Sequence, residues 1–355
     1  MNLNHHRAKS GIALIIVMLV IVVLGMLAAG LAYSMKVETK LARNASAEPE
    51  LELLGLAGVQ LASYVLAPMP PCPYDALNQK WAGGVGSDCD TNAALADTSL
   101  KDNKLGRGSF SITIIDLERK VNINYASRPV LEKAVDLLGL DLIDSSTIVD
   151  SVEDWRDRNE NPQVNGAESA YYLGLPKPYV AKDGPIDDLS EMLLIRGVTP
   201  EIYWGPGGSH RVSAPAGATY GAVTTKPTGS VGLFDLFNTV GRMQININTA
   251  PKEVLQLLPG IDENLAEGII RQRAGLDGVD GTEDDTPFQS AGELSFNVPG
   301  MNPQFVQQLQ QFCGVRSFTF EVHIDAEIDQ YKRRLVALLF RTGSRSVQVL
   351  NMHWE

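Results

Sequence analysis

The sequence predicts an α+β fold in which one long N-terminal helix packs on a small sheet, and a large, mostly helical domain is inserted between strands of that sheet. Three observations lead to this prediction. Residues 12–35 form an uncharged run of 24 residues, long enough to cross roughly 30 Å of hydrocarbon as a helix. Apolar and polar residues alternate at Phe110–Ile114 and again at Phe318–Ile324, as in strands. Between these strand patterns, residues 120–312 carry helix-like spacing.

The composition indicates an acidic protein with enough apolar residues for two packed domains. The 355 residues include 42 Asp and Glu against 30 Lys and Arg, a formal net charge of −12, and 44% are hydrophobic. A negative balance argues against a nucleic-acid or anionic-lipid surface and suits the binding of cations.

The apolar run follows a short basic head, so the head is expected to stay in the cytoplasm and the rest to be exported. The basic residues are His5, His6, Arg7 and Lys9. Three interpretations of the run are open: a cleaved secretory signal, a plain membrane anchor, or a leader that is cut after Gly11. The junction between Gly11 and Ile12 resembles that of type IV prepilins, whose prepilin peptidase leaves the apolar helix on the mature protein. It implies one span of the bacterial inner membrane, with the bulk of the chain in the periplasm.

The apolar helix is expected to continue beyond the membrane. Residues 36–66 are rich in Ala, Leu and Glu, with apolar residues spaced for one helical face. Prolines from Pro68 onward end it, and residues 67–107 are predicted to be a loop. Two more strands are predicted over 335–340 and 347–352.

The helical region contains an internal repeat. The segment Val121–Leu131 matches Ile245–Leu255 at a fixed offset of 124 residues, and each copy carries an Asn-Ile-Asn sequence before a helix start. We therefore expect two related helical units, each built from short helix–turn–helix hairpins.

Residues 257–273 resemble a helix-hairpin-helix motif. In DNA-binding versions of this motif, hairpin amides and a helix N-terminus face phosphate. Here Asp262 and Glu263 stand where a phosphate would approach, so the sequence favours a packing hairpin over a nucleic-acid site.

The segment 275–285 is the best candidate for a metal site. It holds five acids and three glycines in eleven residues, and Ca²⁺ takes six to eight oxygen ligands from flexible loops. The predicted ligands are Asp277, Asp280, Glu283, Asp284 and Asp285. The alternative is a solvated acidic turn, and exposure to the periplasm favours the metal.

A second acidic segment falls on one helical face, at Asp150, Glu153, Asp154 and Asp157. Like charges at this spacing destabilise a helix unless they are paired. Arg156 and Arg158 are expected to pair with them, and we favour this over a second ion.

The three cysteines divide into a pair and a single residue. Cys72 and Cys89 flank a Pro- and Gly-rich stretch, and an oxidising compartment favours a disulfide between them. Cys313 is expected to be a small buried hydrophobe. Neither a zinc-ligand spacing nor a GxSxG sequence is present, so an exported hydrolase has no support.

An ordered set of motifs resembles the GspK-type minor pseudopilins of type II secretion systems. In chain order they are Asp154–Asp157, Gly166–Glu168, Tyr171–Tyr172, Asp188–Met192, Gly197–Pro200 and Ile245–Ala250. The family also lacks the acid that pilins usually carry five residues into the mature chain, where this sequence has Ile16.

The resemblance implies a pilin-like fold and calcium in the inserted domain, which we place on the loop 275–285. The implied parts are a leader over 1–11, a membrane helix over 12–35, a pilin-like part over 36–119, an inserted domain over 120–312, and C-terminal strands over 313–355.

The resemblance also implies a non-enzymatic protein that caps the tip of a periplasmic pseudopilus and helps start its assembly with other minor pseudopilins, for protein export. A buried charge without a partner is costly. A subunit with Ile16 cannot neutralise a neighbour's amino terminus, and it tolerates having no subunit ahead of it. The main alternative is a membrane-anchored DNA receptor, which the acidic charge disfavours.

Overall fold

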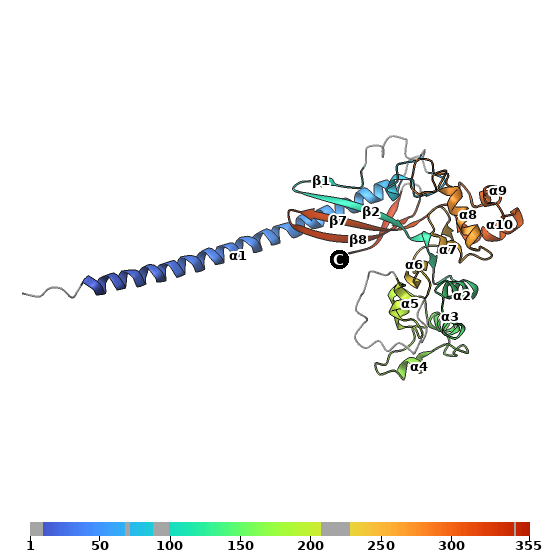
Figure 1. Ribbon diagram of the computed structural model, residues 1–355, viewed down its shortest axis with the longest axis horizontal. Coiled ribbons are helices and arrows are strands. Elements are labelled where there is room, and N and C mark those ends of the chain that lie inside the picture. The colour runs from blue at the N-terminus through green and yellow to red at the C-terminus, as the bar shows by residue number, and fades with distance from the viewer. Residues whose placement is uncertain (1–9, 68–71, 88–98, 207–227, 344–345) are drawn as a thin grey trace, which may run out of the picture.

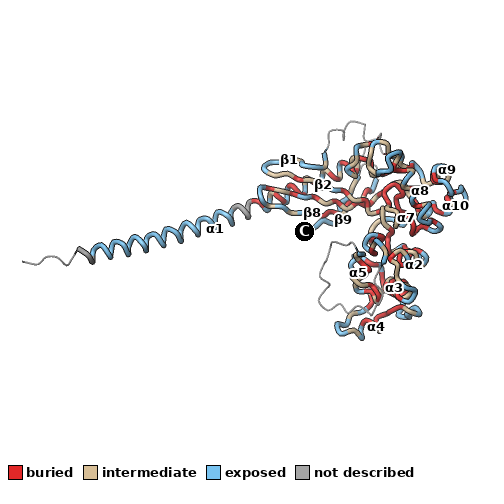
Figure 2. Tube along the Cα trace, viewed as in Figure 1, coloured by how far each residue is buried: buried red, intermediate tan, exposed pale blue. Residues whose placement is uncertain are grey.

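The computed structural model describes residues 10–67, 72–87, 99–206, 228–343 and 346–355. Its first element is a single helix, α1 (Ser10–Val65), whose N-terminal half protrudes from the body (Figure 1). Figure 2 shows this half as exposed, and burial begins near Ala47. Within the described residues, one helix is long and apolar enough to cross a membrane, and it is α1. The predicted long helix is confirmed.

The second half of α1 packs on a five-stranded antiparallel sheet of order β1-β2-β7-β8-β9. The strands are β1 (Asn103–Leu105), β2 (Gly108–Asp116), β7 (Thr319–Ile328), β8 (Tyr331–Arg341) and β9 (Val347–Trp354). Leu54 and Ala62 of the helix share one buried cluster with Phe320 and Ile324 of the sheet. Gly58 allows the close approach, because a Cβ there would lie 2.5 Å from Ile324.

The inserted domain lies between β2 and β7, at the end of the sheet farthest from the protruding helix (Figure 1). Its α-helices are α2 (Arg128–Leu137), α3 (Leu142–Arg156), α4 (Ser169–Leu173), α5 (Pro200–Trp204), α6 (Leu233–Leu236), α7 (Lys252–Leu255), α8 (Glu263–Arg273), α9 (Leu294–Asn297) and α10 (Pro303–Leu309). Its 3₁₀ turns are η2 (Leu117–Arg119), η3 (Leu189–Leu194) and η4 (Ala291–Glu293), and η1 (Lys80–Ala82) lies in the loop after α1.

The sequence repeat is a structural repeat. Unit 1 (121–238) begins with β3 (Val121–Asn122) and ends with β4 (Phe237–Asn238), and these two strands pair in parallel. Unit 2 (245–314) begins with β5 (Ile245–Asn246) and ends with β6 (Cys313–Gly314), which also pair in parallel. Each unit is thus closed by its own two-stranded sheet.

Equivalent asparagines hold the two units in the same way. Asn124 accepts from the amide of Ile186 at 2.8 Å and donates to its carbonyl at 2.9 Å. Asn248, the equivalent residue in unit 2, makes the same pair of bonds with Phe288, both at 2.9 Å. The Asn-Ile-Asn sequences therefore recur because each one clamps a distant backbone segment.

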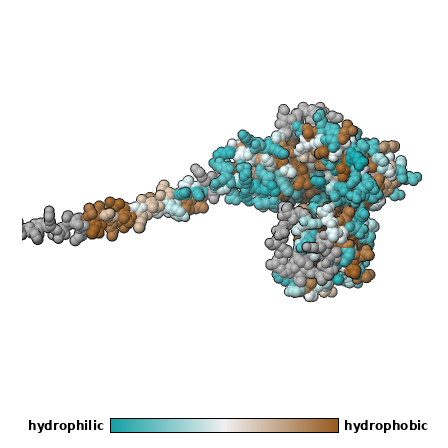
Figure 3. All heavy atoms as spheres, viewed as in Figure 1, coloured by the Kyte–Doolittle hydropathy of each residue, from teal (hydrophilic) through white to brown (hydrophobic). Residues whose placement is uncertain are grey.

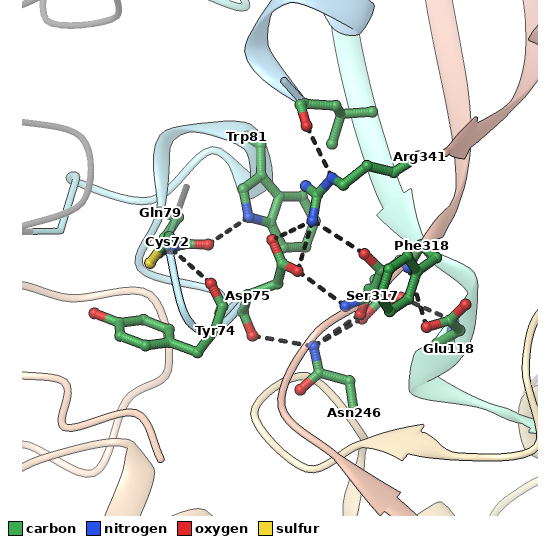
Figure 4. Close-up of polar contacts among 12 residues, drawn as sticks. Cys72, Tyr74, Asp75, Gln79, Trp81, Glu118, Asn246, Ser317, Phe318 and Arg341 are labelled. Atoms are coloured by element: carbon green, nitrogen blue, oxygen red, sulfur yellow. Dashed lines mark hydrogen bonds and ion pairs between the residues drawn. The ribbon is translucent and has the colours of Figure 1, made fainter. Parts of the chain in front are cut away.

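A buried polar network joins the inserted domain to the sheet (Figure 4). Arg341 of β8 donates to both carboxylate oxygens of Asp75, at 3.0 and 2.8 Å, and to the carbonyl of Leu66. Asn246 of unit 2 donates to the Asp75 carbonyl at 3.0 Å and to the Ser317 hydroxyl at 2.8 Å. The loop after α1, the sheet and unit 2 thus meet at one set of hydrogen bonds.

The structure describes two of the three cysteines. Cys72 is disulfide-bonded, and Cys313 is free and buried, as expected for a small hydrophobe. The predicted partner, Cys89, lies outside the described residues, so the pairing stays a prediction. The junction of Gly11 and Ile12 lies in the first turn of α1, and cleavage there also stays a prediction.

Candidate metal centre

Three acids converge where α3 ends and the chain turns toward α4. Asp154 lies in the last turn of α3, Asp157 is its C-terminal cap, and Glu168 is the N-cap position of α4. Their ligand oxygens all lie within 4.8 Å of one another. Two segments separated by a loop therefore supply a compact set of hard oxygen donors, the type that Ca²⁺ prefers.

Asp154 is held by backbone groups in a cradle that needs a glycine. Both of its carboxylate oxygens accept from the amide of Gln163 at 3.1 Å, and the residue is fully buried. A Cβ at Gly166 would lie 1.9 Å from Oδ2 of Asp154. Burial raises the pKa of Asp154 against the opposing effect of the Gln163 hydrogen bond.

Glu168 is the acid of this group whose buried carboxylate the described protein leaves unpartnered. It is 2% exposed, and neither carboxylate oxygen has a hydrogen-bond partner. Burial, followed by the negative charges of Asp154 and Asp157, raises the pKa of Glu168 to about 7. A buried carboxylate without a donor is costly. A cation at this position would remove that cost.

Asp183 adds a fourth acid to the same neighbourhood. One of its oxygens is buried without a partner, and its backbone has φ of +50°, which is uncommon for a non-glycine residue. Burial, then the charges of Glu160 and Asp157, raises the pKa of Asp183. The acids therefore act on one another electrostatically, although they come from three separate segments.

An aromatic cluster packs next to this group of acids. Trp155, next to Asp154 in sequence, meets Tyr172 edge-on at 5.3 Å between ring centroids, and Tyr172 stacks on Tyr179 at 5.1 Å. Tyr172 is fully buried, and its hydroxyl accepts from the amide of Arg196 at 3.2 Å. This packing fixes the end of α3 and the start of α4 relative to each other.

The expected pairing by Arg156 and Arg158 is wrong. Arg128 of α2 holds Asp150 and Glu153, at 2.5 Å to each. Arg156 donates instead to the carbonyls of Ile123 and Ala126. Arg158 forms no ion pair with any described residue.

Asp154 and Asp157 are left without a cationic side chain, which is why they are free to meet Glu168. In the sequence, these acids and the Gly-Ala-Glu motif are separated by a loop without regular spacing. No local pattern therefore predicts that they lie together.

The loop 275–285 occupies the equivalent place in unit 2. It follows Arg273, which donates to the carbonyls of Ile247 and Ala250 as Arg156 does to their counterparts in unit 1. Arg273 also makes a bidentate pair with Asp280, at 2.9 and 2.8 Å. The two acidic loops are therefore the same element of the repeat.

Most of the carboxylates predicted in that loop already have protein donors. Asp284 accepts from the amides of Leu276 and Asp277, at 2.6 and 3.0 Å. Asp285 accepts from the amide of Gly281, and Asp277 from that of Val279, both at 2.8 Å. Among the described residues, Glu283 forms no side-chain hydrogen bond, and only Asp154, Asp157 and Glu168 form a three-acid group within 4.8 Å. Calcium at 275–285 stays a prediction.

The helix-hairpin-helix of unit 2 is built for packing. Asp262 caps α8 by accepting from the amide of Leu265 at 2.9 Å, so an acid stands where a phosphate would approach the helix end. The nearby cation, Lys252, is paired with Glu263 at 2.8 Å and with Glu267 at 3.4 Å. Buried Leu257 and Ile261 join the hairpin to the core of the inserted domain.

Comparison with known proteins finds a match in each unit. The family model of type II secretion system protein K matches residues 109–204, and that of the helix-hairpin-helix motif matches residues 240–313. Among curated proteins, type II secretion system protein K of Klebsiella pneumoniae is 23% identical over 109 residues, 27% of this chain and 33% of that protein. The protein K of Pectobacterium carotovorum subsp. carotovorum is 32% identical over 66 residues, 19% of this chain and 20% of that protein. The aligned segments thus span a third or less of these curated relatives.

The solved structures extend the match to nearly the whole fold. A chain from the crystal structure of the GspK-GspI-GspJ complex of enterotoxigenic Escherichia coli superposes with a TM-score of 0.60 at 16% identity, covering 88% of this chain and 99% of that chain. The chain thus resembles type II secretion system protein K in the sequence of residues 109–204 and a GspK chain in its fold. The predicted fold, a long N-terminal helix on an antiparallel sheet with an inserted helical domain, is confirmed.

Proposed function

We propose that this GspK-type protein is the tip subunit of a type II secretion pseudopilus and helps begin its assembly. The observation that carries the proposal is the place of the inserted domain. It sits at the end of the body opposite α1 and projects to one side of the helix axis (Figure 1). Another subunit stacked ahead of this one would meet that domain, whereas the apolar half of α1 is free to join subunits behind it. Ile16, which gives no carboxylate to a neighbour's amine, supports the same order.

The proposed role is structural and non-enzymatic, in the inner membrane and periplasm. Figure 3 shows a mostly hydrophilic body carried on an apolar helix, as expected for a tethered periplasmic domain. Its partners would be other minor pseudopilins, since the matched E. coli structure is such a complex. A prepilin peptidase would cut between Gly11 and Ile12, which the mass of the native N-terminus would test.

The tip position can be tested by labelling fibres. Val164 is 95% exposed on the inserted domain, so Val164→Cys should accept a gold-linked maleimide without disturbing the fold. We expect one label at a single end of each isolated pseudopilus. Labels spaced along the shaft would contradict the proposal.

We also propose that Ca²⁺ binds the inserted domain, with Asp154, Asp157 and Glu168 as ligands in unit 1. The buried, unpartnered Glu168 carboxylate and the Gly166 cradle support the fit. The ion would neutralise acids that otherwise repel one another, and its role would be structural. The loop of unit 2, with Asp280 and Asp284, would be a second site.

The calcium proposal can be tested by thermal unfolding of the full chain in detergent, with Ca²⁺ or chelator. At a free ion concentration of 100 times Kd, stabilisation should be about 2.7 kcal/mol. Gly166→Ala should abolish most of the response of unit 1, because its Cβ collides with Asp154. Gly174→Ala is the matched control, since its Cβ meets only an ordinary contact at 3.4 Å. An unchanged midpoint in chelator would refute the metal, and Asp280→Ala with Asp284→Ala reports on unit 2.

A further inference from the structure

The two edges of the sheet are of different character. The edge strand β1 has three residues, includes exposed Lys104, and is flanked by the charged Asp102 and Arg107. The opposite edge strand, β9, has eight residues and contains no Asp, Glu, Lys or Arg. Natural sheets usually protect their edges by short strands and charge. The β1 edge of this sheet is protected in that way, and the β9 edge is not.

The free side of β9 offers backbone groups for pairing. The amide of Glu355 donates to the carbonyl of Arg334 in β8 at 2.9 Å. Because the ladder alternates, the N–H and C=O of Met352 and Trp354 point away from β8. Among the described residues, no strand lies beyond β9 in the sheet. Its exposed apolar side chains include Leu350 at 49% and Met352 at 50%.

A groove opens beside this edge, between the sheet and the inserted domain. It has a volume of about 820 Å³. Leu350 and Phe340 line it from the sheet, and Tyr125 and Met243 from the domain. Tyr125 is 60% exposed and Met243 is 47% exposed. Methionine adapts its shape to an incoming side chain, so the groove suits an apolar residue carried by an added strand.

We propose that β9 and this groove accept an extended, uncharged apolar segment of a different pseudopilin, which adds to the sheet as a sixth strand. The inference rests on the assembly role proposed above. A second copy of this chain does not fit. A two-fold pair of β9 strands would be antiparallel, and the strands run alongside α1 (Figure 1), so the two anchors would point in opposite directions. A different pseudopilin is not related to this chain by a two-fold axis, so its membrane anchor can point in the same direction as α1.

The test uses the full chain, purified in detergent with the other minor pseudopilins of its organism. A photo-crosslinking amino acid at Leu350 should join this chain to one of them, through an extended segment of the partner. The same amino acid at Lys104, on the protected edge, is the matched control and should give no such product.

A second arm addresses the backbone itself. Met352→Pro removes an outward N–H and leaves the ladder to β8 intact, since proline is tolerated on the free side of an edge strand. We expect co-purification to weaken about tenfold. Met352→Ala keeps the N–H and should co-purify nearly as well as the wild type.

The outcomes separate the two proposals. If the wild type captures no minor pseudopilin, the assembly role fails and this inference falls with it. If capture survives Met352→Pro and crosslinks arise only from α1, the inference alone is overturned. A crosslink from Leu350 to a helix, or to a second copy of this chain, would also overturn it.

Discussion

At the scale of single residues, Glu168 and Glu118 show how burial sets the charge of an acid. Glu168 has no donor near either oxygen, so the native state can accommodate it only as a neutral acid or beside a cation. Glu118 does have donors, the amide of Phe318 at 3.0 Å and the hydroxyl of Thr319 at 3.3 Å. Burial and the charge of Asp116 nevertheless raise the pKa of Glu118 to about 8. We therefore expect Glu168, but not Glu118, to respond to an added ion.

Glu168→Gln should remove both the calcium response of unit 1 and part of the pH dependence. In chelator, a native pKa of about 7 lies above the ordinary value of 4.5, so the native state keeps a proton that the unfolded chain releases. The contribution of Glu168 to wild-type stability should be fully present below pH 4.5 and should be lost as the pH rises toward 7. Calcium should suppress this loss.

Urea unfolding across this pH range, with Glu201→Gln as an exposed control, measures the effect of Glu168→Gln. A variant that kept the full calcium response would exclude Glu168 as a ligand.

Glu118→Gln should change stability with pH but not with calcium. The wild type loses stability between pH 4.5 and about 8, with a slope of up to about 1.4 kcal/mol per pH unit from this group. The variant should match the wild type at pH 5 and be the more stable of the two at pH 9. Denaturant midpoints at the two pH values test this, and equal losses in both proteins would contradict it.

At the scale of elements, the repeat explains why two acidic loops occur in one domain. In each unit an arginine at the end of a helix binds the two carbonyls around the Asn-Ile-Asn turn, and the acidic loop begins just after it. The loop then returns to a backbone segment clamped by the second asparagine. An ion in either acidic loop would strengthen the contact between that loop and the clamped backbone segment.

Asn248→Ala should destabilise the inserted domain by about 1–3 kcal/mol, because it leaves the N–H and C=O of Phe288 without partners. Asn124→Ala, at the equivalent but less buried position, should cost less. Chemical denaturation of the two variants gives the comparison. If Asn124→Ala cost the same or more, the clamps would not differ by burial as argued.

At the scale of the whole molecule, the ion pair of Arg341 and Asp75 joins β8 to the loop after α1, and Asn246 of unit 2 donates to the Asp75 carbonyl. Both side chains of the ion pair are under 5% exposed, at 3% and 4%. Burying two charges is favourable only with added hydrogen bonds, and Arg341 donates them to the carbonyls of Leu66 and Ser317. The end of α1, the sheet and unit 2 are therefore held together at one buried junction.

Asp75→Asn should cost about 3–5 kcal/mol, since it leaves the buried Arg341 charge unpaired. Calorimetry should then show the sheet and the inserted domain unfolding in separate steps. The double variant Asp75→Asn with Arg341→Met removes that charge and should recover part of the loss. A single unshifted transition in Asp75→Asn would show that the pair does not couple the two parts.

The sequence by itself determined the elements of this protein whose signal is local. The uncharged run of α1, the alternation in β2 and β7, and the repeat at an offset of 124 residues are all spacings along the chain, and hydrophobic burial converts such spacings into helix faces and strand faces. The order of the motifs along the chain was also sufficient to predict the resemblance to GspK-type pseudopilins.

Only the tertiary structure decided which charges meet. Arg156 stands beside Asp157 in sequence, yet its guanidinium is directed to backbone carbonyls, and Arg128 from another helix takes the acids of α3. Glu168 lies near Asp154 because of an irregular loop, and Asp75 meets Arg341 across a sequence separation of 266 residues. Ion pairing depends on distance in space, which is set by the packing of helices and sheet and leaves no periodic trace in the sequence.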